Sequence, residues 1–183
     1  MVLGCWNGYL YTSTDSGNSW TSRMTDAQRL WAGVASSSDG SKLVACNKNG
    51  YIYTSTDSGV SWTARMTDAT RFWTDVASSA DGNFLTAVML GGQIYHSTDA
   101  GVTWTTIAAS RDYVRVASSA DGLVLMAGVS GGTWGYVHTF NGAFTTPGTL
   151  GYLSGQKHSA VELLYVGSDT FLPISHEGLL NAY

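Results

Sequence analysis

Hydrophobic and polar residues alternate in short runs along the chain, and clusters of Gly, Ser, Asp and Asn separate the runs. In a typical stretch we expect strands at 31–36, 42–46 and 51–55, and a fourth strand that leaves its turn through residues 61–63. The first two strands flank an Asp-Gly pair, which is a strong hairpin signal. Short strands with a turn every few residues predict an all-β domain of the sandwich, barrel or propeller type.

The same pattern recurs at a fixed spacing. The segments that begin at Tyr11, Tyr53 and Tyr95 have nearly the same ten-residue sequence and are spaced by 42 residues. A second marker, ASSSDG or ASSADG, ends at Gly40, Gly82 and Gly122. A period near 42 with four strands per period predicts the blades of a β-propeller.

The two ends of the sequence depart from the repeat. Residues 1–146 hold the regular copies, of which the first starts at a second strand and the last, at 139–144, is degraded. In the irregular segment 147–183, residues 160–166, 171–175 and 179–183 still predict strands. We expect one domain over 1–183, with 147–183 closing a ring of five blades. Three alternatives remain: a four-bladed ring, a fragment of a larger ring, or a homo-oligomer joined through the terminal strands.

Each regular repeat carries the turn S-x-D-x-G-x-[ST]-W. We expect its Asp to accept backbone N–H groups, its Gly to take a conformation that other residues resist, and its Trp to be buried between blades. These residues are Asp15, Gly17, Trp20, Asp57, Gly59, Trp62, Asp99, Gly101 and Trp104. The turn resembles the Asp-box, or BNR, repeat of sialidases, sortilin-type receptors and photosystem II assembly factors. This resemblance implies a structural turn at the blade periphery, implies no reaction, and slightly favours an extracellular or surface location.

Positions that vary within the constant frame locate a candidate binding site. The loops that join second to third strands differ between blades, and binding residues concentrate on loops that a rigid scaffold holds. Aromatic platforms with hydrogen-bonding groups favour a carbohydrate ligand, and the candidate ligand-binding residues are Trp6, Asn47, Lys48, Asp75, Arg115 and Trp134. Alternatively, the two Trp residues pack between blades and Asp75 pairs with Arg115. A protein-interaction or assembly scaffold, of a surface or viral kind, is the second hypothesis.

Catalytic and metal-binding patterns are weak. Sialidases bind a carboxylate with three arginines, and this sequence has Arg29, Arg71 and Arg111 at one position of the repeat. Because the repeat distributes these arginines around the ring, they do not converge on one site. Ion pairs with Asp26 and Asp68 are favoured instead. A glycoside hydrolase fragment of sialidase type is therefore the weakest hypothesis. The four His residues have no metal-ligand spacing. We expect no catalysis, no metal and no cofactor.

Composition narrows the partners. Charged residues make up 12% of the chain and the formal net charge is −4, which argues against nucleic acid. No apolar run has the length of a membrane span, and residues 1–6 lack the features of a signal peptide. The compartment stays unknown. Cys5 and Cys46 form either a disulfide or two buried thiols, and thiols are favoured.

Overall fold

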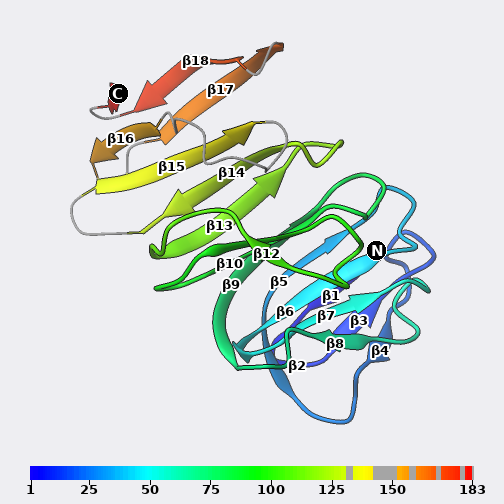
Figure 1. The fold of residues 1–183 in the computed structure, drawn as a ribbon. Coiled ribbons are helices and arrows are strands. Elements are labelled where there is room, and N and C mark those ends of the chain that lie inside the picture. Colours follow the sequence, from blue (N-terminus) through cyan, green and yellow to red (C-terminus); the bar gives the residue numbers. More distant parts are fainter. Residues whose placement is uncertain (131–133, 142–151, 157–159, 168–169, 178–179, 183) are drawn as a thin grey trace.

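A computed structural model gives the fold of residues 1–130, 134–141, 152–156, 160–167, 170–177 and 180–182, with side chains described for 1–130 and 137–140. The chain forms successive antiparallel sheets that follow one another as blades (Figure 1). Blade one contains β1 (Val2–Gly4), β3 (Leu10–Thr12) and β4 (Thr21–Arg23), and β2 (Trp6–Gly8) follows β1 in the chain but pairs with the first strand of blade two. Blade two contains β5 (Arg29–Ser36), β6 (Leu43–Gly50), β7 (Ile52–Ser55) and β8 (Thr63–Arg65).

The later blades repeat this order. Blade three contains β9 (Arg71–Ser78), β10 (Leu85–Met89), β11 (Ile94–Ser97) and β12 (Thr105–Thr106). Blade four contains β13 (Tyr113–Ser118), β14 (Val124–Val129), β15 (Trp134–Asn141) and β16 (Tyr152–Gln156). The last strands are β17 (Ala160–Gly167), β18 (Thr170–Glu177) and β19 (Leu180–Ala182). The all-β class and the four-stranded blades predicted from the repeat are thus confirmed.

Several strand boundaries differ from the prediction, and two of the differences have a clear physical reason. The fourth strand of blade two begins at Thr63 rather than Ser61, because the Asp57 carboxylate still holds the Ser61 amide N inside the turn, at 2.9 Å. The second strand, β6, runs on to Gly50, because its last residues leave blade two and pair with Phe72 and Arg71 of blade three. The strand ends therefore tie neighbouring blades together.

The hydrophobic core lies between adjacent blades. Leu10 of blade one packs with Trp31, Ala45 and Tyr53 of blade two. One cluster joins blades two and three, and another joins blades three and four. Each blade therefore buries its apolar side chains against its neighbours, as expected of a repeat fold.

The three strands predicted in the C-terminal segment are present as β17, β18 and β19, and the segment also contains β16, which was not predicted. β19 pairs with β16, and β17 pairs with β18. The first and last strands lie at opposite ends of the molecule (Figure 1). Pairing of the C-terminal strands with blade one does not occur among the described residues, so ring closure and the number of blades stay predictions. Residues 142–144 of the degraded fourth copy lie outside the described residues.

Two smaller observations complete the fold. Cys5 and Cys46 are both free thiols, as favoured from the sequence, but only Cys46 is buried, and Cys5 is partly exposed. Within the ranges given above, no helix has the length and apolar character needed to cross a membrane.

Candidate functional site

The repeated turn is held by its own side chains. Asp57 accepts hydrogen bonds from the Ser61 amide N at 2.9 Å and from the hydroxyl groups of Ser61 and Ser55 at 2.5 and 2.8 Å. The buried Ser55 Oγ also accepts a bond from the Gly59 amide N at 2.8 Å. The Trp62 indole donates back to the Gly59 carbonyl at 3.0 Å. The turns at Asp15 and Asp99 repeat these contacts, so their residues are committed to the fold.

The indole of the turn packs toward the preceding blade. Trp62 packs against the cluster that contains Leu10, and Trp104 packs against the cluster between blades two and three. Trp62 and Trp104 are half-buried, whereas Trp20, in blade one, is 40% exposed, so the prediction that all three indoles are buried is wrong for Trp20 and holds only in part for the other two. The amide of Ser58 donates to the Ser41 carbonyl at 2.9 Å, which places the box turn beside the loop between β5 and β6.

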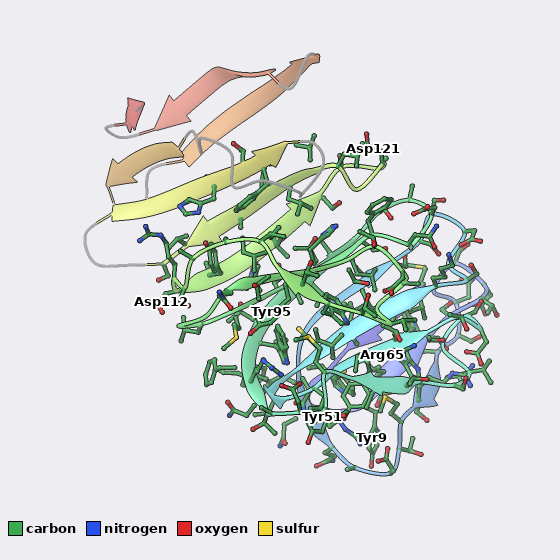
Figure 2. The ribbon with its side chains drawn as sticks, in the orientation of Figure 1. Tyr9, Tyr51, Arg65, Tyr95, Asp112 and Asp121 are labelled. Atoms are coloured by element: carbon green, nitrogen blue, oxygen red, sulfur yellow. The ribbon has the colours of Figure 1, made fainter. Side chains whose placement is uncertain are left out.

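The two ends of the blades form different faces. We call the end with the box turns and the Ser-Ser-x-Asp-Gly loops (36–40, 78–82, 118–122) the box face. We call the end with the second-to-third loops (5–8, 47–50, 89–92) and the blade connections (24–28, 66–70, 107–112) the variable face. Asp112 and Asp121 lie at opposite ends of β13 and mark the two faces (Figure 2).

A row of mostly apolar side chains crosses three blades on the variable face. It consists of Trp6, Leu30, Lys48, Phe72 and Leu90, which we call the aromatic row. Cross-strand pairing sets its order, because Trp6 is opposite Leu30 and Lys48 is opposite Phe72. The Leu90 amide donates to the Phe72 carbonyl at 3.0 Å. Trp6 is 59% exposed and Leu90 is 39% exposed, so the row presents apolar surface to solvent.

Lys48 connects the two aromatic rings of the row. Its Nζ lies 5.0 Å from the centre of the Trp6 ring and 4.4 Å from that of Phe72. Both distances are within the range of a cation–π interaction. Lys48 forms no ion pair with any side chain of 1–130 or 137–140, so its charge is open to an external acceptor.

The other predicted site residues are placed differently. Asn47 Oδ1 accepts a bond from the Leu30 amide at 3.0 Å, so its side chain holds β6 to β5. Asp75 accepts bonds from the amides of Val76 and Val116, at 3.0 and 3.2 Å, and burial raises the pKa of its carboxyl. Arg115 donates to the Val114 carbonyl rather than to Asp75, so the expected Asp75–Arg115 ion pair is not formed.

The structure thus brings together two of the predicted residues, Trp6 and Lys48. The alternative in which Trp6 packs between blades does not fit its exposure. The side chain of Trp134 lies outside the described ones. The sequence analysis did not identify Phe72 and Leu30 as site residues. They occupy the same position of the repeat, which is Asp112 in blade four, so this position differs from blade to blade. That variation was the signal that could have found them.

The repeated arginines have structural partners. Arg29 and Arg71 each pair with an Asp three residues earlier, at 2.7 and 2.6 Å. The guanidinium carbon of Arg71 lies 5.4 Å from the centre of the Tyr95 ring and 5.9 Å from that of Trp73. These contacts confirm the predicted pairs with Asp26 and Asp68. In the part of the chain whose side chains are described, no cluster of His, Cys, Asp or Glu could hold a metal ion.

No family model and no curated protein sequence matches the chain. Solved structures do. YCF48 bound to a D1 peptide is 18% identical with a TM-score of 0.61, over 88% of this chain and 51% of that one. An ancestral GH74 enzyme is 16% identical with a TM-score of 0.62, over 96% of this chain and 30% of that one. A protein of a nidogen–laminin complex is 9% identical with a TM-score of 0.62, over 76% and 57% of the two chains.

These similarities establish the fold. The chain is a β-propeller, as the repeat predicted, and it spans about half the length of YCF48 and less than a third of the GH74 enzyme.

Proposed function

We propose that this chain is a non-catalytic binding module whose variable face binds a segment of another protein. The observation that carries the proposal is the aromatic row, in which the cation of Lys48, which forms no ion pair with a described side chain, lies close to the rings of the exposed Trp6 and of Phe72. Exposed aromatic residues are enriched at the energetic centres of protein interfaces. The constant repeat positions hold the blades, and the row lies where the blades differ.

The chemistry of the row favours a peptide over a sugar. Sugar sites need several hydrogen-bonding groups around the aromatic platform, and the polar candidates Asn47 and Asp75 are already bonded to backbone amides. Lys48 remains as a donor. A peptide would place apolar side chains on Trp6 and Phe72, and a carboxylate or carbonyl oxygen near Lys48 Nζ. A structural relative, YCF48, has been solved with a peptide bound, which agrees with this use of the fold.

Carbohydrate binding is the second candidate. The exposed indole of Trp6 offers the flat apolar surface on which a sugar ring can stack. We favour it less because only one free polar side chain, Lys48, lies in the row.

Absence of catalysis is part of the proposal. The carboxylates of the box turns accept hydrogen bonds from their own turns, and Asp26 and Asp68 pair with arginines. These groups are occupied by structural roles, and Asp112 on the variable face accepts a bond from the Gly91 amide at 2.9 Å, so the described side chains offer no evident acid–base pair there.

The test selects peptides that bind the folded chain from a random-peptide display library. A glycan array is probed with the same chain in parallel. Selected peptides should bind Trp6→Ala at least about 30-fold more weakly, the size of a strong interface residue. Lys48→Met, which keeps the chain length and removes the charge, should weaken binding of acidic peptides. Val60→Ala is the matched control, because Val60 is 66% exposed on the box face.

Two outcomes would contradict the proposal. Peptides whose affinity is unchanged by Trp6→Ala and Lys48→Met would show that the row is not the site. Glycans that bind in a Trp6-dependent way, with no peptide selected, would replace the peptide by a sugar.

A further inference from the structure

One arginine of the blade connection recurs in blades two, three and four. Its backbone keeps the same place in the fold, because it pairs each time with the glycine that ends the second-to-third loop of the preceding blade. These pairs are Arg29 with Gly8, Arg71 with Gly50 and Arg111 with Gly92. The three arginines can therefore be compared as equivalent residues.

In blades two and three this arginine is occupied by its own connection. Arg71 Nη2 lies 2.6 Å from the Asp68 carboxylate. Its Nη1 also donates to the carbonyls of Met66 and Ala69, at 3.3 and 3.1 Å. Arg29 makes the same contacts in blade two. A guanidinium at this place in the fold thus holds a carboxylate.

Blade four keeps the arginine but not its carboxylate. The residue three places before Arg111 is Ala108, where Arg29 and Arg71 have an Asp. Among the side chains of 1–130 and 137–140, no carboxylate forms an ion pair with Arg111. Arg111 is exposed, whereas Arg29 and Arg71 are half-buried. Its charge is therefore accessible to an acceptor from outside the chain.

The rings beside the arginine change in the same blade. Blade four has Tyr113 and His138 at the positions of Trp73 and Tyr95 in blade three. The Tyr113 hydroxyl lies 3.4 Å from His138 Nδ1. Burial raises the pKa of Tyr113 and the Arg111 charge partly offsets this rise, whereas burial and the Arg111 charge both lower the pKa of His138. The Arg111 side chain therefore lies near two polar groups instead of a Trp and a Tyr.

Arg111 also lies beside the end of the aromatic row. The loop that carries Leu90 is tied to the segment that carries Arg111, because the Gly92 amide donates to the Arg111 carbonyl at 3.1 Å and accepts the reverse bond through its carbonyl at 2.8 Å. The next residue, Asp112, accepts a bond from the Gly91 amide at 2.9 Å and lies on the variable face (Figure 2). A peptide that follows the row past Leu90 would reach Arg111.

We propose that Arg111 binds a carboxylate supplied by the peptide, in the role that Asp26 and Asp68 have for the arginines of blades two and three. An Arg–carboxylate pair forms two parallel N–H···O bonds, which fixes the orientation of the bound group. This inference rests on the proposed function and names its partner as an acidic peptide. The carboxylate belongs either to an Asp or Glu side chain or to the C-terminus of the peptide.

Arginine modification by phenylglyoxal, read by mass spectrometry, tests the proposal in the unchanged chain. The probe is a peptide selected on the chain from the display library, at about ten times its Kd. It should slow the modification of Arg111 about tenfold, because about nine-tenths of the chain is then occupied. Arg115 is exposed in the same blade and serves as the internal control, whose modification rate should not change.

Variants of the chain and of the peptide identify the bound group. Arg111→Gln should weaken binding about tenfold or more, as expected for losing hydrogen bonds to a charged group. Arg115→Gln removes the same charge from blade four and should leave the affinity unchanged. Replacing each acidic residue of the peptide by its amide, or amidating its C-terminus, shows which carboxylate is used. The change that weakens binding to wild type should have no further effect on Arg111→Gln.

The outcomes separate this inference from the proposed function. Peptides that depend on Trp6, but neither protect Arg111 nor lose affinity with Arg111→Gln, would overturn the inference and leave the peptide-binding function in place. Failure to select any Trp6-dependent peptide would overturn both. The protection assay needs no variant, so it decides the question even if Arg111→Gln fails to fold.

Discussion

Gly59 is expected to be a contact point between blades rather than merely a turn residue. Its φ of +86° lies in the region that favours glycine. A Cβ atom placed there would come within 2.5 Å of Thr12 Cγ2 of the preceding blade and 3.0 Å of Leu43 Cδ1. Gly59→Ala therefore adds steric overlap between blades to the backbone strain.

Gly40 provides the matched control. Its φ is +74°, but a Cβ atom there would meet nothing within 4 Å. Placing an alanine in this left-handed backbone conformation should lower the free energy of unfolding by about 1–2 kcal/mol in both variants. Overlap in a packed region adds about 1–3 kcal/mol, so Gly59→Ala should cost about 2–5 kcal/mol in total.

Urea denaturation measures both costs, and a third change identifies their source. Thr12→Ser removes only the clashing methyl group and keeps the hydroxyl that accepts a bond from Arg23 Nε at 2.9 Å. In this background Gly59→Ala should cost less by about 1 kcal/mol or more, which is a measurable coupling between contacting residues. Equal costs for Gly59→Ala and Gly40→Ala, or no coupling with Thr12→Ser, would refute the reasoning.

Two further predictions concern ionisable groups. Hydrogen bonds from Ser61 and Ser55 lower the pKa of Asp57 from 3.8 to about 2, so its stabilising contribution is present above about pH 4 and lost as pH falls toward 2. The difference in Tm between wild type and Asp57→Asn should therefore shrink over that range, and a constant difference would contradict the assignment. Cys46 is buried with its pKa raised to about 12, so a thiol reagent should modify Cys5 in the native protein and Cys46 only after unfolding. Modification of both thiols in the native state would show that the core opens around Cys46.

The sequence was sufficient where structure depends on local chemistry. Asp57, Gly59 and Trp62 define a turn through contacts within a few residues, and the same letters recur in each blade. The period then fixed the blades, and loop variation pointed to Trp6 and Lys48.

Residues whose roles depend on partners far along the chain were harder to predict. Asn47 has a polar side chain of the kind that often binds ligands, but its amide oxygen accepts a bond from the backbone of Leu30, 17 residues away in the chain. Asp75 and Arg115 occupy the same position of the repeat, but the Asp75 carboxylate accepts the Val116 amide, whereas Arg115 is exposed and donates to the Val114 carbonyl, so they form no ion pair. Phe72 joins the site only because β6 extends into the next blade and sets Lys48 opposite it.

Hydrogen–deuterium exchange of the chain with a display-selected peptide tests the central claim most directly. We expect the peptide to slow exchange in the loops 5–8, 47–50 and 89–92, which carry the aromatic row or adjoin it. The box-face loops around Asp39, Asp81 and Asp121 should exchange as in the free protein. Protection confined to those box-face loops, with the aromatic row unaffected, would contradict the claim that the variable face is the binding site.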